Sequence, residues 1–564
     1  MKNKSNLKEK GITLVALVIT IIILLILAGI SISALTNTGI FEKAKEAKKK
    51  SEEASAKEQS LLTEYEDELN RYTSNDRWDG KVNKPELMTG MKAIQFNDPT
   101  DSTEGSVKEV TDSNKNDWYN YDEKKWANAK TEDGSMWVWI PRYAYKVVYK
   151  DPSDKSKGGT FDIVFLIGTT DNYYDENGNL QTAQRQTSEN QTIETDSTKT
   201  DKYTVHPAFT NESKINYANG GWKKELAGIW VSKFEAGFAS GNNKAPVKAS
   251  NVNYSQATAW VAAGEAGTTN DSEQPARNWL DGIYGSTTTA IKYPTFQGLT
   301  YSMNYINHSD AFSISKALTN DGNIYGLKSS STDSHLIKNS EWGAVSYLSQ
   351  SKYGLNGENI VINNVSLYNS TTSVYAVTGC AAGTSDAGAV STTIDKLNER
   401  SQDGVYVWTQ KNGTKASSTG TIYGIYDMSG GIWERSAAIV NNGDGNLDTY
   451  GKSIMNALNN GKSTAYVTVY PKGEIPGQSL DDSNKANYAA NTKIYGDAIR
   501  ETSTAGVEQS SWYSDDSYFA GAYAPFFARG GYYWSTSGAG LFSFARSGGY
   551  SNYTDGFRSV LVAQ

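Results

Sequence analysis

One long hydrophobic segment near the N-terminus dominates the pattern of hydrophobic and polar positions. Residues 12–35 contain no charged side chain. As a helix they would extend about 36 Å, which is enough to cross a hydrocarbon core of about 30 Å. A lysine-rich leader precedes this segment, and the residues after Leu35 are polar on average. The pattern therefore predicts an anchor helix at residues 12–35, which places the chain at a cell membrane.

A second helical pattern follows the anchor. Between residues 36 and 73 most positions are charged or small, but Leu62, Tyr65, Leu69 and Tyr72 recur at spacings of three and four. That spacing places the four side chains on one face of a helix. We therefore expect residues 36–73 to form a helical stalk that ends at Ser74-Asn75-Asp76.

Beyond residue 81 the pattern changes to short strands and tight turns. Met136–Pro141 and Tyr143–Tyr149 predict strands, as does Gly228–Glu235. Asn177-Gly178 is typical of a hairpin turn. Trp342, Val345 and Leu348 recur in Glu341–Leu348, which predicts a short amphipathic helix.

Two stretches of this body are polar and irregular, and we interpret them as insertions at about residues 152–211 and 443–511. No repeat of 20 to 50 residues is apparent, which argues against a solenoid or a propeller. The predicted fold class is α+β, with a body at residues 81–564.

Composition narrows the possible functions. The net charge is −8, so the chain lacks the basic surface expected of a nucleic-acid-binding protein. Its single cysteine, Cys380, excludes an internal disulfide and a cysteine-based zinc site, and it is expected to be a small buried residue. The 36 tyrosines and 51 glycines are typical of binding loops, where tyrosine provides contact area at low entropic cost.

Candidate metal ligands are few. His206, His308 and His335 lie far apart in the sequence without metal-ligand spacing, and each is expected to be structural or superficial. One segment alternates oxygen donors that could bind calcium, but a polar turn explains it equally well, so no metal or other cofactor is predicted. The segment comprises Asn442, Asp444, Asn446 and Asp448.

The start of the anchor resembles the leader of type IV pilins. In Lys10-Gly11-Ile12-Thr13-Leu14-Val15 the resemblance implies cleavage between Gly11 and Ile12, with residues 1–11 as the leader. The helix would then serve as an anchor, with pilin-like subunits as possible partners in a filament. Major pilins usually carry Glu at the fifth mature position, where this chain has Ala16, so a minor pilin or an anchored pilin-like protein fits better. An uncleaved single-span anchor remains the alternative.

The body resembles the formylglycine-generating-enzyme (sulfatase-modifying factor) family, which has a variant of the C-type lectin fold. The main motif is Tyr423–Glu434 (YGIYDMSGGIWE). The resemblance covers residues 228–564 and implies a lectin-like body with short twisted strands and long loops. Four further motifs occur in the order of the family: Ile229–Glu235, Leu336–Trp342, Phe527–Gly531 and Gly556–Leu561.

The same resemblance implies scaffold roles for several residues. Trp433 is expected to fill a core and Glu434 to hold loop backbone, while Arg529 and Arg558 hold carboxylates or carbonyls. Enzymatic members need a pair of copper-binding cysteines, so this chain is expected not to be an enzyme. Gly431 and Arg435 replace the usual Asn and Trp, which argues against the calcium contact of the family at this loop.

In C-type-lectin-like proteins the C-terminal segment commonly forms the exposed binding face. Here that segment also resembles the variable regions of diversity-generating retroelement targets, which favour Tyr, Ser, Asn, Asp and Phe. An ordinary aromatic-rich sheet edge is the alternative, with some rings facing the core. The candidate ligand-binding residues are Tyr532, Tyr533, Trp534, Ser543, Arg546, Tyr550, Asn552 and Tyr553.

These observations predict a ligand-recognition protein of the adhesin or receptor-binding type. Its body would be extracellular, at the cell surface or on a pilus, and its ligand would be a glycan or a protein. The alternative is a minor pilin or pseudopilin whose head is structural and has no dedicated ligand.

Overall fold

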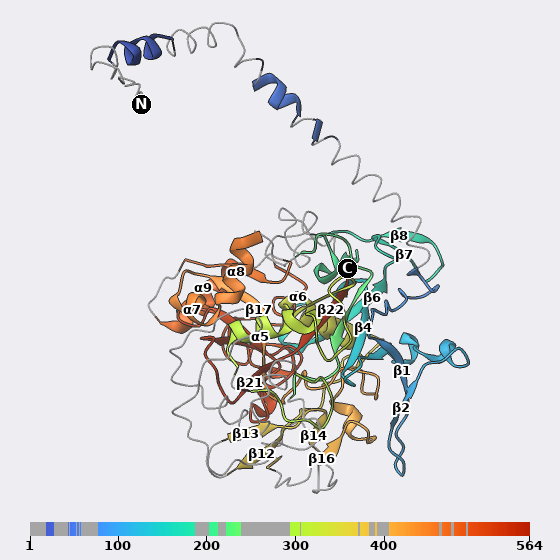
Figure 1. Cartoon of the computed structure of the whole chain (residues 1–564). Coiled ribbons are helices and arrows are strands. Elements are labelled where there is room, and N and C mark those ends of the chain that lie inside the picture. Colours follow the sequence, from blue (N-terminus) through green and yellow to red (C-terminus); the bar gives the residue numbers. More distant parts are fainter. Residues whose placement is uncertain are drawn as a thin grey trace, which may run out of the picture. The chain divides into compact units, whose positions relative to one another are not determined.

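The computed structural model divides into two compact units, Met1–Thr73 and Ser74–Gln564, and we call the second unit the body (Figure 1). The structure describes residues 18–27, 43, 45–51, 54–55, 57, 77–185, 202–211, 221–237, 294–304, 306–369, 373–382, 390–391, 405–461, 465–474, 479–491 and 494–564.

In the N-terminal unit, residues 18–27 and 45–51 are helical. The other positions of the predicted anchor lie outside the described residues, as do the cleavage positions Gly11 and Ile12 and the apolar stripe from Leu62 to Tyr72. Within the described residues, no helix is both long enough and apolar enough to span a bilayer.

The largest sheet of the described body is antiparallel throughout and has the strand order β11-β22-β10-β4-β3-β1-β2. Every residue of β10 is buried, so this strand lies in the core. The strand predicted at Gly228–Glu235 ends at Ser232, three residues earlier than expected. The strands are β1 (Lys92–Asn97), β2 (Ser106–Glu109), β3 (Asn128–Lys130), β4 (Met136–Pro141), β10 (Gly228–Ser232), β11 (Thr332–Leu336) and β22 (Ser559–Ala563).

A second sheet has the order β18-β17-β19-β20, and β21 pairs in parallel with the start of β17. It brings the Tyr423–Glu434 motif beside the last strands of the chain, because Glu434 lies opposite Arg529 in the β17–β19 register. The strands are β17 (Trp433–Asn441), β18 (Thr468–Pro471), β19 (Phe526–Arg529), β20 (Phe544–Ser547) and β21 (Asp555–Phe557).

Further strands form small sheets, and short 3-10 helices connect many of the elements. The strands are β12 (Val365–Asn369), β13 (Ser373–Ala376), β14 (Cys380–Ala382), β15 (Val390–Ser391) and β16 (Val405–Val407). The 3-10 helices are η1 (Lys115–Asp117), η2 (Tyr121–Glu123), η3 (Lys155–Lys157), η4 (Pro207–Phe209), η8 (Ala317–Thr319), η9 (Gly413–Ala416), η10 (Trp512–Ser514) and η11 (Thr536–Gly538).

Two helices pack in the middle of the body, α5 (His308–Lys316) and α6 (Asn339–Ser349). The predicted helix at Glu341–Leu348 is confirmed, but its amphipathic character is wrong, because every residue of α6 is buried. Trp342 donates its indole N–H to the carbonyl of Leu541 at 2.8 Å. The polar positions of α6 therefore face protein instead of water. Mixed helices and short strands confirm the α+β class.

The predicted insertion at residues 152–211 is more regular than expected. β6 (Gly159–Phe165) pairs with β5 (Tyr143–Tyr149), and β5 also pairs with β9 (Thr204–Val205). Alternate β6 residues, including Phe161, Ile163 and Phe165, are buried. The predicted Asn177-Gly178 turn joins β7 (Asn172–Tyr174) to β8 (Leu180–Thr182).

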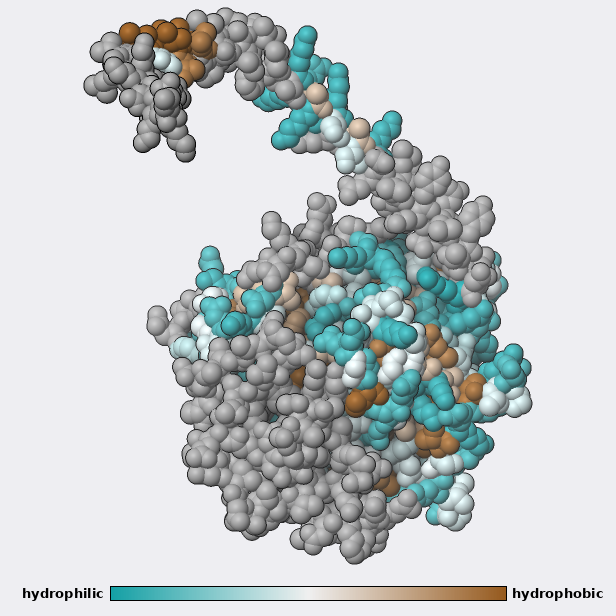
Figure 2. Space-filling view, in the orientation of Figure 1, coloured by the Kyte–Doolittle hydropathy of each residue, from teal (hydrophilic) through white to brown (hydrophobic). Residues whose placement is uncertain are grey.

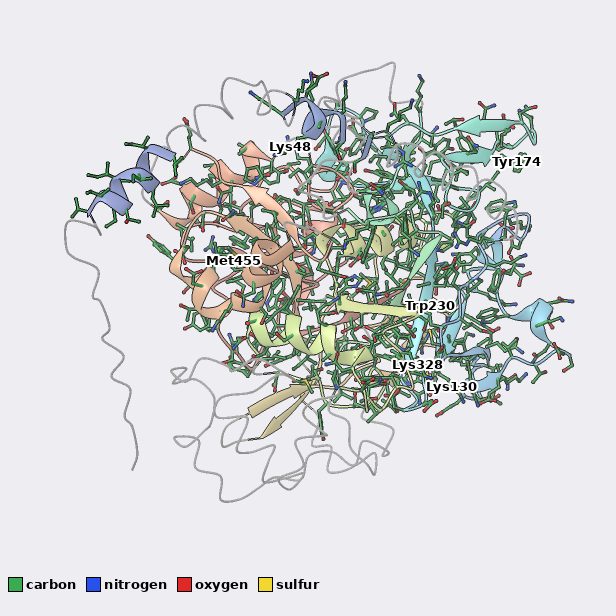
Figure 3. The ribbon with its side chains drawn as sticks, turned by 45° about the horizontal axis from the view of Figure 1, so that its top comes forward. Lys48, Lys130, Tyr174, Trp230, Lys328 and Met455 are labelled. Atoms are coloured by element: carbon green, nitrogen blue, oxygen red, sulfur yellow. The ribbon has the colours of Figure 1, made fainter. Side chains whose placement is uncertain are left out.

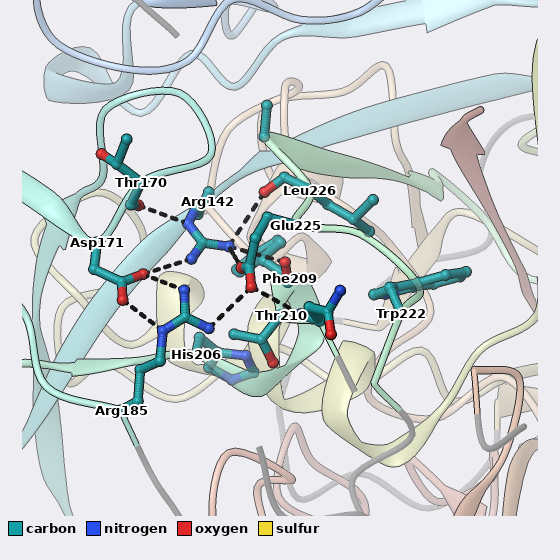
Figure 4. A network of polar contacts seen from close by, with 12 residues as sticks. Arg142, Thr170, Asp171, Arg185, His206, Phe209, Thr210, Trp222, Glu225 and Leu226 are labelled. Atoms are coloured by element: carbon teal, nitrogen blue, oxygen red, sulfur yellow. Dashed lines mark hydrogen bonds and ion pairs between the residues drawn. The ribbon is translucent and has the colours of Figure 1, made fainter. Parts of the chain in front are cut away.

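A closed ring of charges ties this segment to the body (Figure 4). The fully buried Arg142 bonds Asp171 at 2.8 Å and Glu225 at 2.9 Å, and Arg185 bonds the same two carboxylates at 2.5 and 3.0 Å. Two guanidinium groups and two carboxylates thus balance in charge, as burial requires. The ring holds together segments that are distant in the sequence.

The second predicted insertion also folds into regular structure. Between residues 443 and 511 lie α7 (Gly445–Tyr450), α8 (Lys452–Gly461), β18 and α9 (Leu480–Ala490), drawn in orange in Figure 1. β18 pairs in parallel with β17, and its Tyr470 packs in a hydrophobic cluster with Phe519 and Phe527. Although its composition is irregular, this segment therefore contributes a strand to the second sheet.

Aromatic side chains fill much of the main core. Trp230 on β10, labelled in Figure 3, lies 5.3 Å from Trp139 on β4 between ring centres. Figure 2 shows that the described hydrophobic side chains on the visible face of the body form small patches among hydrophilic ones.

Candidate ligand-binding surface at the C-terminal loop

The eight predicted ligand-binding residues lie in the last strands and loops of the body, but they differ in exposure. Trp534, Tyr550 and Tyr553 expose 61%, 45% and 42% of their surface to solvent. Three others are partly buried: Tyr532, Arg546 and Asn552.

Tyr533 and Ser543 are buried, and the ligand contact predicted for them does not fit this placement. Tyr533 packs in a hydrophobic cluster with Ala376 and Ile432, and its N–H donates to the carbonyl of Gly431 at 2.9 Å. Ser543 is fully enclosed just before β20. Neighbouring positions of this segment thus alternate between core and surface. This placement agrees with the alternative of an aromatic-rich sheet edge, in which some rings face the core.

The chain between β20 and β21, residues 548–554, is called the C-terminal loop below. A first aromatic group lies near its start and comprises Tyr450, Tyr523 and Tyr550. The rings of Tyr450 and Tyr550 meet edge to face at 6.2 Å. Tyr523 is 61% exposed and precedes β19, whose first residue, Phe526, pairs with the last residue of β20. Tyr523 is not among the predicted ligand-binding residues, although it lies in the same tyrosine-rich segment.

A second aromatic group lies near the end of the loop and comprises Trp433, Tyr532 and Tyr553. The rings of Trp433 and Tyr532 stack with centres 6.5 Å apart. Burial raises the pKa of Tyr532, and the neighbouring Tyr553 raises it further. Trp433 is only partly buried, so the prediction that it fills a core is wrong; it pairs with Asp555 at the outer end of β17 instead.

A single buried guanidinium holds both ends of the C-terminal loop. Arg435 on β17 is fully buried and donates to the carbonyl of Tyr550 at 2.5 Å and to Asp555 Oδ2 at 2.9 Å. It also donates to the carbonyl of Ile306 at 2.8 Å and to Nδ1 of His308 at 2.6 Å. Charge-assisted bonds of this kind are stronger than neutral ones, so the loop is held before any ligand arrives.

The candidate calcium segment supports the first aromatic group through hydrogen bonds. Asp444 caps α7 by accepting from the N–H of Asn446 at 2.9 Å, and its other oxygen accepts from the N–H of Tyr523 at 3.2 Å. Asn446 donates to the carbonyl of Tyr523 at 2.7 Å, and Asn442 donates to that of Gly521 at 3.1 Å. These contacts fit the polar-turn interpretation that the sequence left open beside calcium.

Arg546 lies on β20 and is engaged with α9. Its guanidinium donates to Asp481 at 2.7 Å and lies 5.0 Å from the ring centre of Tyr518. Both members of the ion pair are partly exposed, so solvent screens their attraction. In this arrangement Arg546 contacts α9, and any contact with a ligand would be in addition to that one.

Beneath this surface, the sequence motifs meet in a buried polar cluster. Arg558 binds Glu434 through two bonds of 2.6 and 2.5 Å, although the two residues are 124 positions apart. The expectation that Glu434 holds loop backbone is therefore wrong. Glu235 takes that role by accepting from the N–H of Ile432 at 3.2 Å. Burial raises the pKa of Glu235 well above its usual range, and Asp427 and Glu434 add to the effect.

Arg529 and Arg558 both have the scaffold roles predicted for them from the sequence. Besides its carboxylate, Arg558 binds the carbonyl of Ser232 at 3.0 Å. Arg529 donates to the carbonyls of Asp497 and Ala498, each at 3.1 Å. These contacts join the strand ends to loops and give the cluster a scaffold role.

The cysteine and the three histidines, which were considered as reactive or metal-binding residues, are buried. Cys380 is 2% exposed, and burial raises the pKa of its thiol. His206, His308 and His335 are fully buried, and His335 contacts Asp333 at 3.0 Å and Glu341 at 2.9 Å. In the part of the chain that the structure describes, no three His, Cys, Asp or Glu side chains gather as metal ligands.

In comparisons with known proteins, no protein-family model and no curated protein matches the chain.

Proposed function

We propose that this chain is a membrane-tethered recognition protein whose lectin-like body is displayed outside the cell and binds an external ligand, a glycan or a protein. The hydrophobic segment at residues 12–35 supplies the tether, and the pilin-like leader is removed after Gly11. The C-terminal loop and its two aromatic groups supply the binding surface.

The observation that carries this proposal is the exposure of aromatic rings on the anchored C-terminal loop and in the segments just before β19 and after it. Trp534, Tyr523, Tyr550 and Tyr553 each expose more than 40% of their surface. Rings left in water at rigid positions offer contact area without the entropic cost of ordering a loop. Arg435 provides that rigidity from below through its buried bonds to Tyr550 and Asp555.

The lectin-like architecture rests on the positions of the motifs in the sheets. The strand at Gly228–Ser232 lies beside the last strand of the chain, and the Glu434–Arg558 pair joins two of the motifs. Tyr550 and Tyr553 of the C-terminal loop remain exposed to solvent. We propose binding and not catalysis, because the contacts within the fold account for these charged residues and Cys380 is buried.

Ligand binding can be tested with the full chain in detergent micelles, applied to printed arrays of oligosaccharides and of cell-surface proteins. Replacing Trp534, Tyr550 or Tyr553 with alanine is expected to weaken capture by about tenfold or more, because each ring supplies about 1–2 kcal/mol at the centre of a small interface. Val107→Ala is the control, since Val107 is an exposed apolar residue on β2 that belongs to neither proposed surface. Equal capture by all four variants would refute the proposed surface.

The tether can be tested by mass spectrometry of chain isolated from membranes. Gly11→Leu is expected to retain the leader that the unchanged chain loses. If filament assembly needs the chain while none of the ring variants alters capture of any array component, the structural-head alternative is the correct one.

A further inference from the structure

A large cavity opens in a part of the body that shares no residue with the C-terminal loop. Its volume is about 820 Å³, within the range of about 300–1,000 Å³ typical of small-ligand sites. It is lined by Tyr203, by Lys352 and Tyr353, and by four segments: residues 78–82, 119–122, 162–165 and 173–176. Residues 173–176 lie in the β7–β8 region, where Figure 3 labels Tyr174.

Aromatic rings form much of the lining. Tyr121 lies between Tyr119 and Phe165, at ring-centre distances of 6.1 and 5.4 Å, and Phe165 meets Tyr353 at 4.7 Å. A separate pair, Tyr173 and Tyr203, packs edge to face at 5.3 Å. Because these rings pack against one another, they are held in place before any ligand binds.

The charges in the cavity are mainly negative. Its five carboxylates, at Asp79, Asp122, Asp162, Asp175 and Glu176, outnumber its two ammonium groups, at Lys81 and Lys352. Two of the carboxylates accept from tyrosine hydroxyls, Asp79 from Tyr119 at 2.7 Å and Asp162 from Tyr203 at 2.5 Å. Carboxylates thus lie beside rings on the cavity wall, and this field repels anions.

The chain already places a cation of its own against this combination of ring and carboxylate. Nζ of Lys146 lies 4.4 Å from the centre of the Tyr203 ring and 3.6 Å from Oδ2 of Asp162. Cation–π attraction operates within about 6 Å of a ring centre. The local chemistry of the cavity wall therefore suits an ammonium or guanidinium group.

We propose that this cavity binds a peptide segment carrying lysine or arginine side chains. The cationic groups would lie over tyrosine faces and near the carboxylates, with Tyr174 and Glu176 at the exposed edge. A neutral sugar could stack on the rings, but it would not use the excess of carboxylates. This inference does not depend on the function proposed for the C-terminal loop.

The first test is calorimetric titration of the full chain in neutral detergent micelles with an end-blocked tetralysine peptide. Binding is expected at about 50 mM salt and should weaken at about 300 mM, because salt screens exposed charges. An end-blocked tetraglutamate peptide and chitotetraose are the comparison ligands, and neither is expected to bind in the cavity. Absence of tetralysine binding at low salt, or salt-independent binding of chitotetraose at this cavity, would overturn the proposal.

Matched variants locate the binding. Tyr174→Ala and Glu176→Gln are each expected to weaken tetralysine binding by about threefold or more, the effect of one exposed cation–π or charge contact. Val107→Ala and Asp448→Asn remove an exposed apolar side chain and an exposed carboxylate outside the cavity, and they should leave the affinity unchanged. Circular dichroism checks that all four variants fold.

Equal affinity in all four variants would mean that tetralysine is attracted only by the overall charge of −8, and the proposal would be wrong. If capture on the arrays depends on the C-terminal loop while tetralysine binding depends on Tyr174 and Glu176, the two surfaces act separately.

Discussion

Replacing Arg435 with methionine tests whether one buried side chain holds the C-terminal loop. Methionine keeps much of the volume of arginine but removes the bonds to Tyr550, Asp555, Ile306 and His308. Breaking a buried ion pair on one side costs about 3–5 kcal/mol, because the remaining charge is left uncompensated. Each carbonyl left without its donor adds a cost of about 1–3 kcal/mol. Hydrogen bonds from water to the carbonyls at the loop reduce this cost. We therefore expect a loss of about 4 kcal/mol or more in the free energy of unfolding.

The assay is denaturant unfolding of the full chain in micelles, followed by tryptophan fluorescence. Arg546→Met is the control, because the Arg546–Asp481 pair is partly exposed and such pairs contribute about 1 kcal/mol or less. The Arg435→Met/Asp555→Asn double variant should show a coupling energy of about 1 kcal/mol or more, since the two residues are in contact.

Hydrogen exchange gives a second and local measurement. The backbone amides of residues 548–554 are expected to exchange faster in Arg435→Met than in the unchanged chain, while those of β10 keep their rates. If Arg435→Met destabilises the body no more than Arg546→Met, or if exchange of the loop is unchanged, Arg435 does not hold the loop and the reasoning fails.

Three further predictions follow from the buried polar residues. Glu434→Gln should cost about 3–5 kcal/mol in unfolding free energy because Arg558 loses its counter-charge. Glu235→Gln should cost less, because burial raises the pKa of Glu235 and so opposes its charged form, and no cation in the described part of the chain is paired with it; similar costs in denaturant unfolding would contradict this. Burial opposes the charge of His335, but Glu341 and Asp333 raise its pKa above the usual value of about 6.5. The stabilisation is then complete below about pH 6.5 and is lost as the pH rises through the folded-state pKa, so His335→Gln should destabilise the body more at about pH 5.5 than at about pH 9; a penalty that grows with pH would argue against it. Cys380, with its raised pKa, should resist thiol-specific reagents in the native chain and react once the chain is unfolded, and rapid native reaction would show that the thiol is accessible.

Local features of the sequence predicted those elements whose pattern is set by near neighbours. The strands at Met136–Pro141 and Tyr143–Tyr149 have the bounds that alternation and aromatic content indicated. The turn at Asn177-Gly178 forms because Gly178 adopts φ of +79°, which glycine tolerates without strain. Phe161, Ile163 and Phe165 show the same alternation, which indicates a strand inside a segment whose polar composition predicts irregular structure.

The candidate site was only partly predictable, because its contacts join distant segments. The tyrosine-rich composition near the C-terminus indicated Trp534, Tyr550 and Tyr553 correctly as exposed. It could not separate them from Tyr533, whose burial depends on packing against Ala376 and Ile432.

By itself, the sequence determined the hydrophobic segment at residues 12–35, the α+β class and the main strands, because periodicity and composition act over a few neighbouring residues. Only the tertiary structure decided that Glu434 pairs with Arg558, that Arg435 supports the C-terminal loop, and that α6 is enclosed on every side. Those outcomes depend on which groups meet after folding, since a buried charge must find its partner wherever the chain brings one.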